Sequence, residues 1–313
     1  MSTSEIQTAA KILREGGLVA FPTETVYGLG ADAGNPLAVA RIFEVKARPS
    51  FDPLIVHVPG LDAARKLVTS FPEKAMKLAL RFWPGPLTLV LPKTSTVPDI
   101  VTSGLPSVAV RVPDHPMALD LLRETDRPIA APSANPFGGV SPTTAAHVRE
   151  GLGDLLDLVL DGGPCRVGVE STIVSFLADP PVLLRPGGIP LEELRAVVGG
   201  IETDPAKRSA PLAPGQLATH YATTTPLYLE NAPPASRRGF LGLRMPEDPD
   251  RFERIEVLAA GDDLRQAAAN LFSALRRLDA AGLDLIEAER VPDRGLGLAI
   301  NDRLFKASRK QMV

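Results

Sequence analysis

The chain has 313 residues, 44% hydrophobic and 23% charged, a composition that excludes a disordered or coiled-coil protein and a length that suits two globular domains. The formal net charge of -3 argues against a polycationic coat for nucleic acid, and the single cysteine, Cys165, excludes a disulfide scaffold and a cysteine-based zinc cage. Because there is no run of 18 apolar residues and no signal core, and a lone cysteine fits a reducing compartment, we expect a cytoplasmic protein without membrane contact.

Helices and strands alternate irregularly over residues 1–200. A capping-box pattern, Ser4 with Gln7, begins a helix that ends at Gly16-Gly17, and Asn35-Pro36 begins the next. Further helices are expected up to Leu67, over 72–82 and 117–123, and from Thr143 or Thr144 to Glu150. Short apolar runs predict strands at 18–21, 53–58, 87–91, 108–112, 128–131, 156–160, 172–176 and 182–184. Since several strands follow one another directly, the pattern predicts a twisted mixed sheet covered by helices.

A stretch rich in Pro, Thr, Ala and Gly, from about Gly199 to Pro226, interrupts this pattern and predicts the main domain boundary. Beyond it we expect strands at 227–229, 239–243, 255–259 and 285–289, a helix over 262–281 and another from about 298. The predicted fold class is therefore α/β. We expect a first domain at 1–200 with a twisted mixed sheet, a linker at 201–226, and a smaller α/β, Rossmann-like domain at 227–313.

Most standard catalytic motifs are absent from the sequence, including the P-loop, H-E-x-x-H and G-x-S-x-G. Gly28, Gly30 and Ala33 match the dinucleotide fingerprint G-x-G-x-x-A, which would indicate a dehydrogenase. That fingerprint should follow a strand immediately and begin a helix, whereas here polar residues come between and the helix begins too late. We therefore interpret this segment as a glycine-bearing loop.

Polar residues follow or interrupt several short apolar runs, where α/β sheets build their sites. Each has an ordinary structural explanation, such as a helix dipole for Lys46 and Arg48, turns for Ser133 and Asn135, or sheet packing for His57. Arg111, flanked by valines, needs solvent, a carboxylate or an anionic ligand. Together they offer four cations, Lys46, Arg48, Arg111 and Arg185, and neutral hydrogen-bonding groups on Ser133, Asn135, Ser141 and Ser171. Such a set suits a carboxylate and phosphates, and favours phosphoryl or nucleotidyl transfer.

The segments FPTETVYGLGADA, VKARPSFDPLIVHV, FWPGPLTLVL, VAVRVPDHP, APSANPFGGVSPT, GVESTIV and LLRPGGI, in this order, resemble the Sua5/YrdC/YwlC family. APGQLATHYA and PDRGLGLAINDRLFKAS are similar to the longer, two-domain Sua5 type, so the resemblance covers nearly the whole chain. It implies a YrdC-like first domain and a threonylcarbamoyl-AMP synthase that uses L-threonine, bicarbonate and ATP with Mg²⁺. It also implies a role in t6A modification of tRNA at position 37, a product passed to the tRNA threonylcarbamoyl transferase, and weak RNA binding.

The resemblance also implies roles for single residues. The catalytic signature falls on Lys46, Arg48, Ser133 and Asn135. The threonine site would use Thr25, His57, Arg111, the backbone at Ala131, and Ser171, with Arg111 on the carboxylate. The ATP site would use Arg48, Asp52, Ser107, Ser133, Ser141, Arg185 and Tyr221, and His220-Tyr221 would close over the nucleotide. Asp52 and Ser107 depart from the family's more frequent Asn and Thr.

Other interpretations remain beside this one. A non-catalytic RNA-binding module would use the same basic residues on a phosphate backbone, although the net charge of -3 and 5% aromatic content disfavour it. A carbamoyl-transfer enzyme of the hydrogenase-maturation kind would carry cysteine-rich zinc-finger segments, and one cysteine does not supply them. Salt-sensitive RNA affinity without threonine-dependent ATP turnover would separate the first alternative from the synthase.

Overall fold

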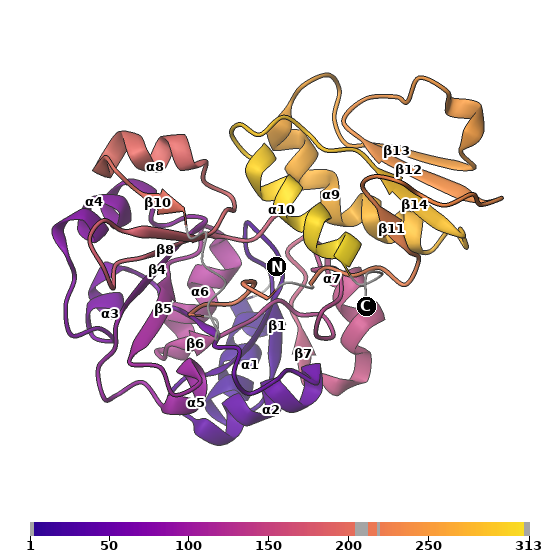
Figure 1. Ribbon diagram of the computed structural model, residues 1–313. Coiled ribbons are helices and arrows are strands. Elements are labelled where there is room, and N and C mark those ends of the chain that lie inside the picture. The colour runs from indigo at the N-terminus through magenta and orange to yellow at the C-terminus, as the bar shows by residue number, and fades with distance from the viewer. Residues whose placement is uncertain (1–2, 204–211, 218–219, 310–313) are drawn as a thin grey trace.

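The computed structural model describes residues 3–203, 212–217 and 220–309, which form two sheets with helices packed on them (Figure 1). The larger sheet is mixed. In spatial order it contains β10 (Glu202–Thr203), β9 (Val182–Arg185), β8 (Thr172–Ser175), β4 (Leu87–Pro92), β5 (Ser107–Arg111), β3 (Ile55–His57), β6 (Ile129–Ala130), β2 (Gly28–Asp32), β1 (Val19–Phe21) and β7 (Leu158–Val159). Its helices are α1 (Thr3–Arg14), α2 (Pro36–Lys46), α3 (Leu61–Arg65), α4 (Glu73–Phe82), α5 (Asp99–Thr102), α6 (Pro116–Thr125), α7 (Ala145–Leu152) and α8 (Leu191–Val198), with a 3₁₀ turn at Gly153–Leu155.

The second sheet is entirely parallel, with the order β11 (Leu227–Tyr228), β14 (Leu285–Ala288), β12 (Arg238–Gly242) and β13 (Arg254–Val257). Helices α9 (Leu264–Asp279) and α10 (Gly297–Ser308) lie on its side nearer the larger sheet, and a 3₁₀ turn spans Pro249–Arg251 (Figure 1). The predicted α/β class, with a twisted mixed sheet and a smaller second unit, is confirmed. No helix among the described residues is both long and apolar enough to cross a membrane.

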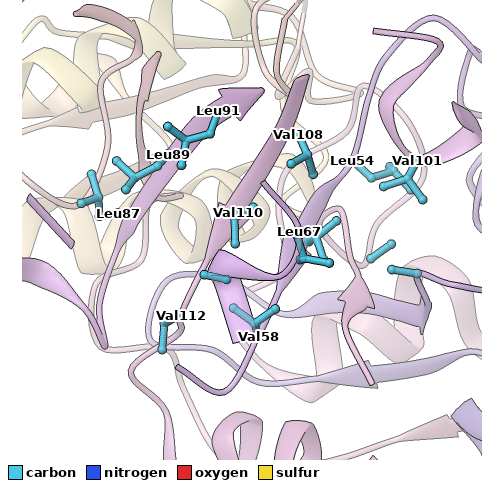
Figure 2. Packing of buried hydrophobic residues seen from close by; sticks show 14 of the residues in the cluster. Leu54, Val58, Leu67, Leu87, Leu89, Leu91, Val101, Val108, Val110 and Val112 are labelled. Carbon is cyan, nitrogen blue, oxygen red and sulfur yellow. The ribbon is translucent and has the colours of Figure 1, made fainter. Parts of the chain in front are cut away.

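The central strands of the larger sheet place polar side chains beside one another. Strand alternation sends valines and leucines of β3, β4 and β5 into the core, where Val108 and Val110 pack with Leu89 and Leu91 (Figure 2). Their neighbours along the strands take the opposite face, so His57 of β3 is paired with Arg111 of β5. The register that buries the core therefore also brings a histidine and an arginine together.

The capping residues predicted for α2 are found in the structure. The Asn35 side chain accepts hydrogen bonds from the backbone N–H groups of Leu37 and Ala38, and Pro36 occupies the first turn. The helix ends at Lys46, and Ala47 follows in the left-handed region with φ of 50°. The left-handed conformation of Ala47 ends the helix immediately before Arg48.

One predicted loop is wrong: residues 28–32 form β2, inside the larger sheet between β1 and β6. A Cβ at Gly30 would lie 2.9 Å from both the Phe21 ring and Ile129 Cγ2, so the glycine allows a close approach of neighbouring side chains. The rejection of the dinucleotide fingerprint agrees with this, because the glycines lie in a strand rather than at a helix start.

Helix α8 and strand β10 were not predicted. β10 falls at the start of the expected linker and pairs in parallel with β9, so those residues extend the larger sheet. Residues 204–211 and 218–219 of the expected linker lie outside the described residues.

Candidate active site

A cavity that is partly open to solvent lies where the larger sheet meets residues 214–215 and 220–221. Its wall is formed by Thr23, Val26, Gly28, Arg48, Ile55, His57, Arg111, Ala131, Pro132, Ser133, Glu170, Ser171, Arg185, Pro214, Gly215, His220 and Tyr221. The structure thus brings together residues from positions 23 to 221. Among the predicted site residues, the wall includes Arg48, His57, Arg111, Ala131, Ser133, Ser171, Arg185 and Tyr221.

The other predicted site residues are buried but are not part of this wall. Thr25 Oγ1 lies 2.9 Å from Thr23 Oγ1, and Ser141 Oγ lies 2.6 Å from Glu170 Oε1, so both contact wall residues. The Asn135 side chain donates to the carbonyls of Pro136 and Gly139. Ser107 begins β5, and its hydroxyl has no hydrogen-bond partner among the described residues.

Lys46 lies behind the wall with its ammonium aimed at backbone. Its Nζ donates to the carbonyl of Ser133 at 2.7 Å and to that of Asn135. No ion pair of Lys46 occurs among residues 3–203, 212–217 and 220–309. Burial, and then the charge of Arg48, hold the pKa of Lys46 well below its ordinary value. The two segments predicted to carry the catalytic signature, at 46–48 and 133–135, are therefore joined by this one side chain.

Arg48 is held by Asp52. Its Nη2 lies 2.9 Å from Asp52 Oδ2, and its Nε donates to the Asp52 carbonyl at 3.0 Å. Burial lowers the pKa of Arg48 and raises that of Asp52, and each charge opposes the effect of burial on its partner. The fully buried Asp52 thus lies behind Arg48, and its contact with nucleotide stays a prediction.

Arg111 and His57 form one side of the wall. Arg111 Nη2 lies 2.8 Å from Glu24 Oε1, and Glu24 Oε2 accepts from the backbone N–H of Asp114 at 2.9 Å. In the described part of the chain, Arg111 Nε and His57 Nδ1 are buried without a hydrogen-bond partner. Burial, and then Arg111, lower the pKa of His57 to about 3, so this ring is neutral near pH 7. Buried polar atoms left unpaired in a cavity wall are available to pair with a bound ligand or a water molecule.

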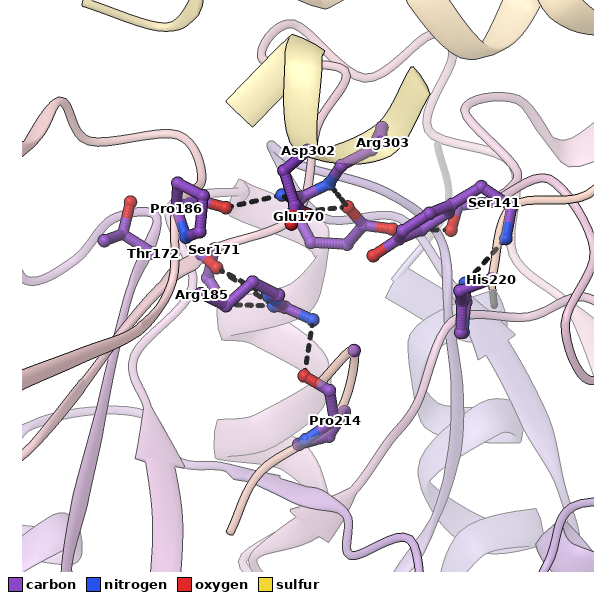
Figure 3. Close-up of polar contacts among 12 residues, drawn as sticks. Ser141, Glu170, Ser171, Thr172, Arg185, Pro186, Pro214, His220, Asp302 and Arg303 are labelled. Atoms are coloured by element: carbon purple, nitrogen blue, oxygen red, sulfur yellow. Dashed lines mark hydrogen bonds and ion pairs between the residues drawn. The ribbon is translucent and has the colours of Figure 1, made fainter. Parts of the chain in front are cut away.

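Arg185, at the end of β9, is held by neutral acceptors. Its Nε and Nη2 donate to the carbonyl of Ser171, and its Nη1 donates to that of Pro214 at 3.2 Å (Figure 3). Nη2 also lies 3.2 Å from Ser171 Oγ, which in turn contacts Thr88 Oγ1. No carboxylate pairs with Arg185 within the described residues, so its charge remains available to an anion.

Glu170 is an acid of the wall that the sequence pattern did not assign to the site. Its Oε2 accepts from Nε and Nη2 of Arg303, which is fully buried on α10, while Oε1 accepts from Ser141 (Figure 3). Burial would raise the pKa of Glu170, but Arg303 and then Arg185 outweigh it and hold the pKa at about 2. Glu170 lies in the segment GVESTIV, just before an apolar run, and this position is the feature of the sequence that could have pointed to it. Arg303 had no such feature, since its partner is 133 residues away.

Lowering the pH should destabilise the wild type more than Glu170→Gln. The folded-state pKa of Glu170 lies below its ordinary value of 4.5, so its contribution, up to about 3 kcal/mol, is present above pH 4.5 and is lost as the pH falls toward 2. The variant should be less stable at pH 7, because Arg303 loses its carboxylate, and should lose less between pH 5 and pH 3. Denaturant unfolding measures both, and equal losses in the two proteins would contradict this role.

His220 and Tyr221 are buried in the wall rather than on an open linker. The Tyr221 ring stacks on Phe272 of α9, with centroids 5.5 Å apart, and Arg303 Cζ lies 5.4 Å from its centroid. Tyr221 adopts a φ of 63°, and burial lowers the pKa of His220 to about 3. His220 and Tyr221 therefore form one side of the cavity wall, and Tyr221 contacts α9 and α10.

Comparison with known proteins identifies two matched regions. The sequence profile described as Telomere recombination matches residues 11–187, and the profile described as Threonylcarbamoyl-AMP synthase, C-terminal domain, matches residues 189–309. Threonylcarbamoyl-AMP synthases of Pyrococcus abyssi and Bacillus subtilis are each 45% identical to this chain; the alignments cover 99% of it and 95% and 94% of the relatives. The crystal structure of P. abyssi Sua5 complexed with L-threonine superposes with a TM-score of 0.93 at 44% identity, covering 98% of this chain and 95% of that one.

Proposed function

The chain belongs to the threonylcarbamoyl-AMP synthase family, and from this premise we propose how its cavity performs the family's reaction. The protein is an L-threonylcarbamoyladenylate synthase, a nucleotidyltransferase that converts L-threonine, bicarbonate and ATP to threonylcarbamoyl-AMP and pyrophosphate for t6A synthesis in tRNA. The observation that carries the mechanism is the arrangement of charge. Arg111 and Arg48 are paired with carboxylates, whereas within the described residues Lys46 and Arg185 donate to neutral acceptors.

The threonine carboxylate would bind Arg111. Support comes from the unpaired Arg111 Nε and His57 Nδ1 in the described part of the cavity wall, which offer a hydrogen-bond donor and a second polar atom on adjacent strands. The Ala131 backbone, Ser171 and, behind the wall, Thr25 would complete this half of the site. Glu24 would hold Arg111 in place by the 2.8 Å ion pair.

The phosphates of ATP would bind near Arg48, Arg185 and Lys46. Charge on the reacting phosphate is best stabilised by cations already fixed in place, and these three are held by buried hydrogen bonds. Ser133, Asn135, Ser141 and Tyr221 would contact the nucleotide or the groups that hold it. Asp52 and Ser107 would act through Arg48 and the start of β5.

In the proposed reaction the neutral amine of threonine and bicarbonate give N-carboxythreonine and water. A carbamate oxygen then attacks the α-phosphorus of ATP, the bond to the β-phosphate oxygen breaks, and pyrophosphate leaves. The neighbouring cation Arg111 favours the neutral amine, so no dedicated base is required. The buried wall formed by His220 and Tyr221 would exclude water, which would otherwise hydrolyse the mixed anhydride.

We propose that Mg²⁺ enters with ATP as part of the substrate. In the described ranges no group of three or more His, Cys, Asp or Glu side chains is arranged to hold a metal ion, and the nearby carboxylates of Asp52 and Glu170 are engaged by arginines. Excess EDTA should therefore abolish pyrophosphate release, and Mg²⁺ in excess over EDTA should restore it. Undiminished release in EDTA would contradict the requirement.

We further propose that the product passes to the tRNA threonylcarbamoyl transferase, that RNA binds weakly, and that the protein acts in the cytoplasm. The acyl adenylate is a reactive anhydride, which favours direct use by the next enzyme. The lone buried cysteine, Cys165, fits a reducing compartment.

Pyrophosphate release from Mg-ATP tests the function, with L-threonine and bicarbonate omitted one at a time and mass spectrometry for threonylcarbamoyl-AMP in the same samples. Release that requires both co-substrates, with the adduct present, is expected. Release without threonine would indicate another acceptor or a plain ATPase. No release from folded protein would contradict the synthase and favour RNA binding.

Deleting residues 211–313 should leave a folded larger sheet with impaired synthesis. The fragment loses the Pro214 carbonyl on Arg185, Tyr221 in the wall and Arg303 on Glu170. Circular dichroism would check the fold, and pyrophosphate release with adduct detection would measure activity. Full activity in the fragment would refute the role of the linker as a cover.

A further inference from the structure

Arg303 connects the second unit to the cavity wall. Its guanidinium is completely buried and donates to Glu170 Oε2 through Nε at 3.0 Å and Nη2 at 2.9 Å. Nη1 donates to the carbonyl of Pro186, the residue after Arg185, at 2.6 Å (Figure 3). One side chain of α10 therefore holds both the acid of the wall and the backbone next to Arg185.

We propose that Arg303 is a positioning residue for the nucleotide half of the site, which restrains the Glu170 carboxylate so that Arg185 stays available to phosphate. This inference rests on the proposed function, because it assigns Arg185 to the phosphates. Glu170 is the only acid in the described wall, and both of its oxygens are engaged, one by Arg303 and one by Ser141.

Arg303 and Arg185 are two cations that compete for the carboxylate of Glu170. A carboxylate beside an arginine forms a strong charge-assisted pair with it unless another donor occupies it. Arg185 lies close to Glu170, because both line the same cavity and Arg185 donates to the carbonyl and hydroxyl of Ser171, the residue after Glu170. The charge of Arg185 also lowers the pKa of Glu170, after the larger effect of Arg303. Without Arg303, Glu170 Oε2 would be unpaired. If Glu170 then paired with Arg185, the charge of Arg185 would no longer be available to the phosphates of ATP.

Further contacts of α10 point to the same half of the site. Lys306 Nζ donates to the carbonyl of Gly215 at 2.7 Å, and Gly215 lies against the Arg185 side chain. Arg303 also lies over the Tyr221 ring. The ion pair of Arg111 with Glu24 involves neither helix of the second unit. Loss of Arg303 should therefore affect nucleotide more than threonine.

The experiment uses the full chain and three variants: Arg303→Met, Arg303→Met with Glu170→Gln, and the control Arg265→Met. Arg265 pairs with Glu193 and also connects the two units, but on an exposed surface outside the wall. Calorimetry gives the Kd of a non-hydrolysable ATP analogue, steady-state kinetics give KM for ATP and for threonine, and thermal unfolding checks the fold.

We expect Arg303→Met to raise the analogue Kd and the ATP KM by about tenfold or more, and the threonine KM by less than about twofold. Removing the carboxylate in the double variant should restore most of the nucleotide affinity, and the control should match the wild type. A folded Arg303→Met with wild-type nucleotide affinity, or a double variant as weak as the single one, would overturn the inference.

If Arg303→Met does not fold, Arg303→Lys replaces it, since lysine keeps the charge but not the two-pronged contact. The Kd of Arg303→Lys for the analogue should rise above the wild-type value, but by less than the rise expected for Arg303→Met. Adding Glu170→Gln should reverse that rise. An unchanged Kd in Arg303→Lys, or a Kd that Glu170→Gln does not restore, would overturn the inference. Analogue binding needs no turnover. A wild type that binds the analogue but makes no threonylcarbamoyl-AMP would refute the proposed function and leave this binding test intact.

Discussion

Replacing Lys46 with alanine is expected to lower kcat by about two to three orders of magnitude while changing the KM for ATP much less. The Lys46 ammonium is buried, is unpaired by any carboxylate within the described residues, and joins the backbone of Ser133 and Asn135 to the end of α2. Its charge would stabilise the α-phosphate most strongly as negative charge develops there. Pyrophosphate release with saturating threonine and bicarbonate measures both constants.

Two controls separate charge from packing. Lys46→Met fills a similar volume without the charge and should be nearly as inactive as the alanine variant. Lys11→Ala removes an exposed lysine of α1 that pairs with Glu15, and should behave as the wild type. As the pH rises, Lys46 loses its proton and with it the charge that supports kcat. Because the pKa of Lys46 is well below its ordinary value, the wild-type kcat should begin to fall at a lower pH than it would if the lysine were exposed. An unchanged kcat in Lys46→Ala would exclude a catalytic role.

Local signals predicted most of the elements that carry the site. Asn35-Pro36 begins α2 as expected, and because the helix ends at Lys46, that cap also fixes where Lys46 and Arg48 lie. The valines around Arg111 predicted a buried strand, and strand alternation then determines that Arg111 takes the face opposite the core. Each of these signals lies within or next to the element that it predicts, so the sequence alone is enough to predict these elements.

The signals failed where a segment's neighbours decide its conformation. Gly28 and Gly30 are poor strand formers in isolation, yet residues 28–32 form β2 because a glycine fits against Phe21 and Ile129. The segment GVESTIV contains Glu170, but nothing in that segment indicates the partner of this acid. Arg303 lies on a helix of the second unit, and no local pattern predicts a contact across 133 residues.

The family likeness identified residues, whereas the structure showed how they are organised. Thr25, Lys46, Asp52 and Ser141 lie outside this wall and contact the wall residues Thr23, Ser133, Arg48 and Glu170, respectively. Sequence spacing cannot separate a wall residue from the residue that supports it, because both are polar and follow the same apolar runs. The structure separates the two groups, because it shows which residues line the cavity and which residues contact that lining.

Arg111→Ala is expected to raise the KM for threonine by about a hundredfold or more, with the KM for ATP changed by less than about threefold. The variant removes the guanidinium proposed to bind the threonine carboxylate and leaves Glu24 buried without its partner. The unpaired acid would also repel the substrate carboxylate. Initial rates of pyrophosphate release over a range of threonine concentrations measure the effect.

The variant Arg111→Ala with Glu24→Gln distinguishes binding from folding. A buried carboxylate without its partner costs about 3–5 kcal/mol, so Arg111→Ala should unfold at a lower temperature, and Glu24→Gln should recover much of that loss. The recovered protein should still bind threonine poorly, because the amide supplies no cation for the carboxylate. If stability and the threonine KM both return to wild-type values, Arg111 supports the fold through Glu24 and does not bind the substrate. Unchanged threonine kinetics in Arg111→Ala alone would lead to the same conclusion.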